Sequence, residues 1–188
     1  ISASADLKNV CFVASNNTVK CFGDSRYGGT GRSLHYIGDE PGEMGSALKA
    51  IDFGTTEKVV DIALGNIHGC AIFETGRVKC WGEGGSYNSG PSGSIGDYVG
   101  EVASSPFFAF GINRKALSMA SGDNHTCVLT DDFEVYCVGN GSDGRLANGY
   151  ADHASANDSL NIAKWGTGRR VIQLTAGQNS TCAMLEAI

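Results

Sequence analysis

Residues 122–139 read GDNHTCVLTDDFEVYCVG, and this stretch decides the fold because most of its pattern occurs again along the chain. Its two cysteines are ten residues apart, and two earlier pairs have the same separation. The first cysteines of the pairs follow one another at nearly equal intervals, and a last cysteine continues the series. A regular period of this kind predicts an array of similar structural units. The pairs are Cys11 and Cys21, Cys70 and Cys80, and Cys127 and Cys137, and the last cysteine is Cys182.

Apolar residues and glycines keep fixed distances from these cysteines. The positions two after the first cysteine and two before the second share the period-2 parity of one strand face. Polar turn-forming residues lie between them, which predicts a β-hairpin with a short loop, although Phe133 stands in the third copy where Gly76 stands in the second. The repeated positions are Val13, Ile72, Leu129 and Met184; Val19, Val78 and Val135; Gly23, Gly82 and Gly139; Gly65, Gly122 and Gly177; and, ten before the first cysteine, Ile1, Val60, Leu117 and Ile172.

An aromatic-glycine pair precedes each later unit, at Phe53-Gly54, Phe110-Gly111 and Trp165-Gly166. The aromatic residue always lies at the same distance before the next cysteine, whereas the stretch before the aromatic residue becomes shorter from one unit to the next. Paired strands resist insertions because a one-residue slip turns every side chain to the other face, but surface connections tolerate them. Each unit is therefore expected to combine a strand part of fixed length with a variable loop.

The third unit (residues 122–127 and 135–149) and the second (residues 68–72 and 78–82) resemble the RCC1-type propeller repeat. The resemblance covers nearly the whole chain and implies an all-β fold, a seven-bladed β-propeller with four-stranded blades. This chain would supply about three complete repeats and the start of a fourth. Their expected ranges are about 1–58, 59–115, 116–170 and 171–188.

Some features depart from the usual repeat. The Trp-Gly pair of the family is Phe22-Gly23 in the first unit and Val138-Gly139 in the third. The variable loops are long, and residues 37–39 of the first are echoed by residues 95–97 of the second. In these respects the chain resembles cysteine-rich members of the family that are secreted or anchored at the cell surface, more than the nuclear exchange factor that named it.

The paired cysteines would lie directly opposite each other across the hairpins, close enough for cross-strand disulfides. The alternatives are buried free thiols and a zinc site. Zinc fits less well, because the position two before the first cysteine is histidine only in the second and third copies (His68 and His125). Cys182 is expected to be unpaired, since its partner would be residue 192, and this suggests that the chain is a segment of a longer protein.

Disulfides at this density indicate an oxidising compartment, so we expect an extracellular or cell-surface protein. Asn-X-Ser/Thr sequences, which accept glycans in secreted proteins, agree with this expectation. Two of them coincide with the repeat pattern itself (Asn124 and Asn179), which is a simpler explanation for their presence. The five candidate acceptors are Asn16, Asn124, Asn140, Asn157 and Asn179.

Neither composition nor motifs point to catalysis. The formal net charge of −6 argues against a nucleic-acid surface, and no apolar run is long enough to span a membrane. His68 and His125 occupy a repeat position, where hydrogen bonding within a blade is expected, and His35 and His153 lie in variable loops. The acidic residues within 39–43 could bind calcium but lack EF-hand spacing, so a solvated turn is favoured. We expect no catalytic residue, metal or cofactor.

Tyrosines in the variable loops are the best candidates for recognition, since tyrosine provides contact area with little loss of entropy. The alternative is that they pack the loops onto the blades. Our first functional hypothesis is a non-enzymatic scaffold for assembly or adhesion, whose partners are other chains, further blades of the same polypeptide, or glycans. The alternatives are a secreted binding protein (an inhibitor or a lectin) and a small-GTPase exchange factor. The tyrosines are Tyr27, Tyr36, Tyr87, Tyr98 and Tyr150.

Overall fold

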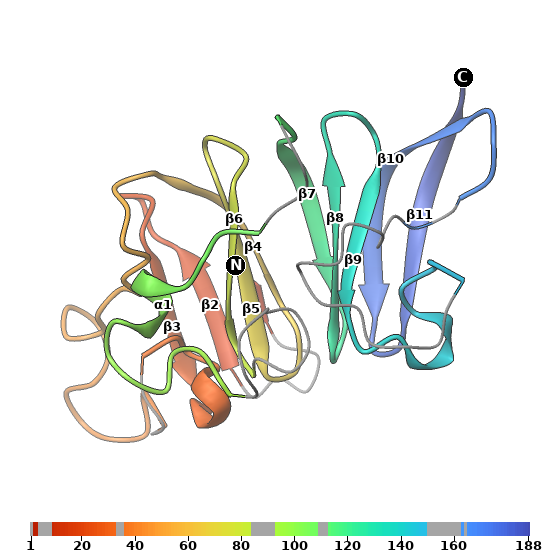
Figure 1. The fold of residues 1–188 in the computed structure, drawn as a ribbon. Coiled ribbons are helices and arrows are strands. Elements are labelled where there is room, and N and C mark those ends of the chain that lie inside the picture. Colours follow the sequence, from red (N-terminus) through yellow and green to blue (C-terminus); the bar gives the residue numbers. More distant parts are fainter. Residues whose placement is uncertain are drawn as a thin grey trace.

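The computed structural model describes residues 2–3, 9–32, 36–83, 93–108, 113–149, 163 and 165–188. Within these residues the chain forms four small antiparallel sheets, which follow one another along the sequence and stand side by side (Figure 1). The prediction of an all-β fold built from similar units is confirmed. The hairpin turns that join the second and third strands lie at the upper end in Figure 1, and the short helical turns that follow β3 and β9 lie at the lower end.

The first three sheets contain three strands each, in sequential order, and the fourth contains two. Each of the three larger sheets places its two cysteine-bearing strands side by side, with the cysteines opposite each other. The strands are β1 (Ser2–Ala3), β2 (Asn9–Val13) and β3 (Val19–Gly23); β4 (Val59–Leu64), β5 (His68–Phe73) and β6 (Val78–Gly82); β7 (Ala116–Ser121), β8 (His125–Thr130) and β9 (Val135–Gly139); and β10 (Arg169–Gly177) with β11 (Ser180–Ala187).

Helical structure is limited, within the described residues, to short turns: η1 (Arg26–Gly28), η3 (Ser142–Gly144) and the four-residue α1 (Glu101–Ser104). The η1 and η3 turns follow β3 and β9 at the same place in their units, and both contain a left-handed residue, Tyr27 or Asp143. The described part of the chain contains no helix with the length and hydropathy that a membrane span requires.

A continuous fourth strand, implied by the resemblance, is absent from the described parts of the first three sheets. Isolated bridges join Gly23 to Ile37 and Gly82 to Ile95 at the outer edge of β3 and β6. Further along the same edges, single hydrogen bonds of 2.8 Å run from Ile51 N to Val19 O and from Phe108 N to Val78 O. The chain that follows β3 or β6 therefore touches the outer edge of its own sheet at two points. Between these points it leaves the sheet, so it forms a loop and not a fourth strand.

The core lies between neighbouring sheets. The cysteine and valine positions of one sheet pack against the next, and Val19, Val78 and Val135 are fully buried. Burying a valine contributes roughly 1.5–3 kcal/mol each. Phe53 packs edge-to-face against Phe73 and Trp81, with ring centroids 5.3 and 5.6 Å apart, so the aromatic-glycine position belongs to this core in the second unit.

The apolar position ten before the first cysteine behaves differently. The strand register shifts at Val60, Leu117 and Ile172, which indicates a β-bulge at the same place in β4, β7 and β10. These three side chains are 60%, 54% and 44% exposed. The apolar residue repeats at this position because it lies at the bulge of β4, β7 and β10, and it does not belong to the core.

Candidate functional site

All three cysteine pairs form cross-strand disulfides in the structure, with Cα atoms 4.1, 4.0 and 4.0 Å apart. The half-cystines are buried between sheets, whereas Cys182 on β11 is a free and exposed thiol. The described residues contain no cluster of three or more His, Cys, Asp or Glu side chains suited to a metal ion. The cysteines thus join neighbouring strands at the centre of each blade.

Two histidines connect one blade to the next. His68 Nε2 lies 2.8 Å from Thr126 Oγ1, and His125 Nε2 lies 2.8 Å from Thr181 Oγ1. The Thr181 hydroxyl donates to the carbonyl oxygen of Arg145 at 3.1 Å, so His125 Nε2 must supply the proton of its own bond. We refer to these two His–Thr pairs as the histidine locks. The expectation that these histidines bond within one blade is wrong, because both locks join blades.

Burial keeps both rings neutral. It lowers the pKa of His68 to about 3, helped by His125, and lowers the pKa of His125 to about 4, helped by Arg145. Each neutral imidazole is buried and bonded to a threonine of the next blade, so the contacts that the structure shows for it are structural.

The glycines before each lock are explained by close approach of the next blade. A Cβ built on Gly65 would collide with the His68 ring and lie 2.5 Å from the carbonyl oxygen of Gly122. A Cβ on Gly122 would likewise meet the His125 ring and lie 2.5 Å from the carbonyl oxygen of Gly177. Glycine is required at this position because backbone and imidazole occupy the space of a side chain.

A second type of contact between blades ends on the helical turns. Trp81 Nε1 donates to the carbonyl oxygen of Gly29 at 3.1 Å, and Gly29 corresponds to Arg145, which accepts from Thr181 in the third unit. Asn9, which replaces the lock histidine in the first unit, donates to the same Gly29 oxygen at 3.2 Å. Trp81 and Thr181 thus donate to equivalent carbonyl oxygens of the preceding unit, whereas the bond of Asn9 lies within the first unit.

Lys79 is a site that the sequence did not reveal. Its side chain on β6 is 2% exposed, and Nζ donates to the carbonyl oxygens of Phe53, Val102 and Ala103, each at 2.9 Å. Burial lowers its pKa, and neighbouring Arg77 lowers it further. Three acceptors satisfy the three N–H groups of the ammonium, so Lys79 anchors α1 to the sheet. The sequence cannot show this role, because two of the three acceptors belong to α1, which lies beside Lys79 only in the folded chain.

The variable loops of the first two units contain the same closed turn, which we call a clasp: Ile37–Glu43 and Ile95–Glu101. Oε2 of Glu43 accepts hydrogen bonds from the amides of Gly38 (2.7 Å) and Glu40 (3.3 Å), and these bonds lower the Glu43 pKa. Oε2 of Glu101 does the same for Gly96 (2.9 Å) and Tyr98 (3.0 Å). Each clasp therefore holds its tip in a fixed conformation.

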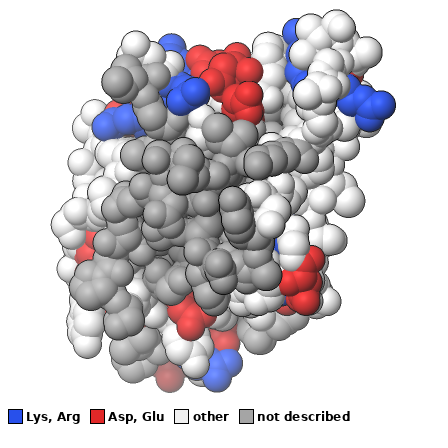
Figure 2. Space-filling view, turned by 45° about the vertical axis from the view of Figure 1, so that its right-hand side comes forward, with Lys and Arg blue, Asp and Glu red and all other residues white. Residues whose placement is uncertain are grey.

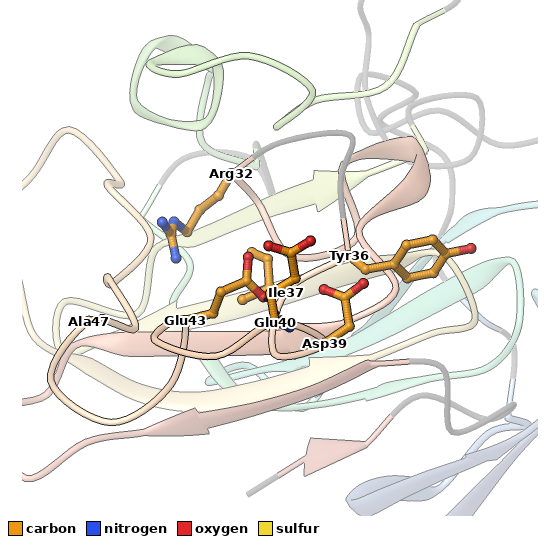
Figure 3. Close-up of a pocket in the computed structure, with 7 residues that line it drawn as sticks. All are labelled: Arg32, Tyr36, Ile37, Asp39, Glu40, Glu43 and Ala47. Atoms are coloured by element: carbon orange, nitrogen blue, oxygen red, sulfur yellow. Dashed lines mark hydrogen bonds between the residues drawn. The ribbon is translucent and has the colours of Figure 1, made fainter.

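An open pocket of about 510 Å³ lies against the first clasp. Figure 3 shows Arg32 on one side and the carboxylates of Asp39, Glu40 and Glu43 beside it, while the Tyr36 ring extends outward past Asp39. The guanidinium of Arg32 donates to the carbonyl oxygen of Lys49 at 3.2 Å. The acidic turn predicted here is thus a structured loop, in which the Glu43 carboxylate is engaged by the backbone.

The structure describes some of the tyrosines and glycan acceptors that the sequence predicts. Tyr27, Tyr36 and Tyr98 are 52%, 49% and 68% exposed, at the same end of the first two sheets as the clasps. Asn16 and Asn179 are exposed, whereas Asn124 and Asn140 are half-buried. The predicted residues that lie outside the described ones are Tyr87, Tyr150, Asn157, His35 and His153.

Several arginines on the described surface form ion pairs with neighbouring carboxylates. Ion pairs join Arg77 to Glu57, Arg114 to Asp132 and Arg170 to Glu186. Figure 2 shows basic atoms in small groups near acidic ones on the described part of that face, without a continuous basic patch.

The sheets, their order and the repeated contacts between them define a segment of a β-propeller. The RCC1 repeat family ("Regulator of chromosome condensation (RCC1) repeat") matches residues 59–88 and 117–145. The "Regulator of chromosome condensation" of Xenopus laevis is 30% identical over 145 residues, which cover 77% of this chain and 31% of the relative. The chain thus contains RCC1-like repeats, and it spans about a third of the length of this relative.

Solved structures show the same fold. Yeast RCC1 (Prp20), in a crystal structure bound to Kap60, matches 96% of this chain and 41% of its own, with a TM-score of 0.71 and 15% identity. The CRINKLY WD40 ectodomain of the Arabidopsis thaliana receptor kinase ACR4 matches 96% of this chain and 47% of its own, with a TM-score of 0.50 and 15% identity. At these identities the likeness concerns the fold alone.

Proposed function

We propose that this protein is a non-enzymatic, extracellular or cell-surface scaffold, in which disulfide-bonded blades hold loops that mediate assembly or adhesion. One observation carries the proposal: in each of the three larger sheets a buried disulfide joins the second and third strands in the same register. The repeat units are taken to be residues 1–58, 59–115, 116–170 and 171–188.

The energetic role of the disulfides supports this location. Each joins two cysteines ten residues apart, and closing such a loop stabilises a fold by about 2–3 kcal/mol through restriction of the unfolded chain. Such bonds persist in oxidising compartments and are rare in the cytosol and nucleus. The ACR4 match carries the same fold in a protein described as an ectodomain, so the fold is compatible with an extracellular setting. Exposed Asn16 and Asn179 are available acceptors for glycans.

The position of the polar groups supports a binding rather than a catalytic role. The two described histidines are locked between blades, and the buried Lys79 amine is held by three carbonyl oxygens. The exposed carboxylates and aromatic rings lie instead in the clasps and tyrosines at the lower end of the first two sheets. A rigid sheet carrying shaped loops suits recognition of other chains.

The test is a disulfide map of the chain secreted from eukaryotic cells. Alkylation before digestion, followed by non-reducing mass spectrometry, should give three peptides linked within hairpins and a modified Cys182. Glycan release should shift the mass of the peptide with Asn16, and sedimentation at increasing concentration should show association. Free thiols at all seven cysteines in the native source would overturn the proposal.

The competing hypothesis is an intracellular role like that of the Regulator of chromosome condensation relatives, for which our alternative from the sequence is exchange-factor activity on a small GTPase. Accelerated nucleotide release from a small GTPase, together with reduced cysteines, would favour that hypothesis. A monomer that binds one soluble protein tightly would favour the inhibitor, and glycan binding would favour the lectin.

A further inference from the structure

Most of the net charge of the chain is concentrated in the two clasps. Residues 36–47 and 93–105 hold five carboxylates and no lysine or arginine, in a chain whose formal net charge is −6. Two of the five are engaged by backbone amides, namely Glu43 and Glu101. The side chains of Asp39 and Glu40 are exposed. Each clasp is therefore an acidic segment without a positive charge of its own.

The η1 turn brings the two clasps and three exposed tyrosines together. A Cβ added to Gly28 would lie 2.6 Å from the carbonyl oxygen of Ile95 and 3.1 Å from Oδ1 of Asp97, so η1 rests directly on the second clasp. On its other side, the guanidinium carbon of Arg26 lies 5.8 Å from the centroid of the Tyr36 ring beside the first clasp. The clasps thus border one surface, although they belong to the variable loops of two different units.

The molecule already holds one guanidinium on this surface. Arg26 pairs with the Asp24 carboxylate at 2.6 Å while it lies over the Tyr36 ring. A carboxylate and an aromatic face together are a favourable environment for a cation, and arginine exploits both. Asp39 and Glu40 line one pocket together with Tyr36, so carboxylates and an aromatic ring are both present there for a second cation. The rings of Tyr27, in η1, and Tyr98, in the second clasp, are exposed as well.

We propose that the clasp surface, defined as Tyr27, Tyr36, Asp39, Glu40 and Tyr98, docks a segment of a partner protein that is rich in arginine and lysine. The inference rests on the proposed function, for which it names the chemistry of the partner. Because Arg32 lines the far wall of the pocket, a cationic side chain enters from the side of Asp39 and Tyr36 (Figure 3). The excess of negative charge favours a cationic segment over a neutral glycan, which gains nothing from long-range attraction.

The experiment measures binding of a fluorescein-labelled octa-arginine peptide to the purified 188-residue chain by anisotropy. The test variant is Asp39→Asn with Glu40→Gln, and the matched control is Glu74→Gln with Glu134→Gln, which removes the same charge from exposed hairpin turns at the opposite end. We expect the test variant to bind about three- to tenfold more weakly and the control to bind within twofold, since exposed ion pairs contribute modestly. Tyr98→Ser should weaken binding separately by about two- to fivefold.

Equal binding by the test and control variants would overturn the proposal, as would equal affinity for an octa-glutamate peptide. Binding of a neutral oligosaccharide that depends on Tyr98 but not on Asp39 and Glu40 would assign the surface to glycans instead. The disulfide map separates this outcome from the proposed function: a disulfide-bonded, secreted chain that ignores octa-arginine refutes only the docking surface. Circular dichroism and the disulfide pattern of each variant verify that it is folded.

Discussion

Substitution of Gly122 by alanine tests the packing between the third and fourth sheets. The new Cβ would overlap the His125 ring and lie 2.5 Å from the backbone carbonyl oxygen of Gly177. The backbone cannot move away without separating two sheets, and the ring cannot move without breaking its 2.8 Å bond to Thr181. Overpacking costs roughly 1–3 kcal/mol and a buried polar group left without its bond costs roughly 1–3 kcal/mol more. We therefore expect Gly122→Ala to lower the free energy of unfolding by about 2–6 kcal/mol.

The chain contains its own control for this prediction. Gly177 occupies the same repeat position in the fourth unit, where Ser180 replaces the lock histidine. A Cβ on Gly177 would meet only the Ser180 hydroxyl, at 3.1 Å, and a hydroxyl can rotate away. Because alanine also reduces the entropy of the unfolded chain by an amount worth up to about 1 kcal/mol, Gly177→Ala should be nearly neutral.

Urea unfolding followed by tryptophan fluorescence, with disulfides intact, measures both variants. The difference between them should reach about 3 kcal/mol. If Gly122→Ala and Gly177→Ala agree within about 0.5 kcal/mol, the close approach of imidazole and backbone does not explain the repeated glycine.

Three further predictions concern the turns, the disulfides and acid. Phe133→Gly should raise the free energy of unfolding by about 1 kcal/mol in urea titrations, because Phe133 adopts a φ of 63° where the second unit has glycine; a loss of stability would contradict this. Removal of one disulfide by Cys127→Ala with Cys137→Ala should lower it by about 2–3 kcal/mol, to which the cavity left by the two buried sulfur atoms adds a further loss, and unchanged stability would argue against the stabilising role. Burial lowers the pKa values of His68 and His125 to about 3 and 4, below an unfolded value near 6.5, so their stabilising effect is complete above pH 6.5 and is lost as the pH falls towards 4. Within that window, each histidine should lower the free energy of unfolding by about 1.4 kcal/mol for each unit by which the pH falls. Melting temperatures measured at pH 7.0, 5.5 and 4.5 should therefore decrease, and the decrease should be smaller for His125→Gln than for the unchanged protein.

The sequence is most informative about structure within one hairpin, and least informative about contacts between sheets. Cysteine spacing and valine parity predict the hairpins, because strand register places those side chains opposite each other on one face. The same parity does not tell which side of a strand another blade covers, so the role of His68 between blades was missed. Lys79 has no sequence signal, because its acceptors come from residues 53 and 102–103, which only the folded chain brings together. The exposed bulge at Val60 was equally hidden, since an apolar repeat reads as core.

The disulfides within blades are sensitive to reductant, whereas the histidine locks between blades are sensitive to acid. The disulfides join strands within one sheet, so reduction weakens each blade but leaves the contact of His125 with Thr181 chemically unchanged. Acid has the opposite effect, because protonation of His125 at Nδ1 places a positive charge between two sheets, which destabilises their packing while the sulfur bonds persist. In an array where each blade contacts only its neighbours, these two kinds of bond make separable contributions to stability. Reductant at pH 7 should therefore produce loosened blades that remain stacked, and acid under oxidising conditions should produce intact hairpins that come apart from one another.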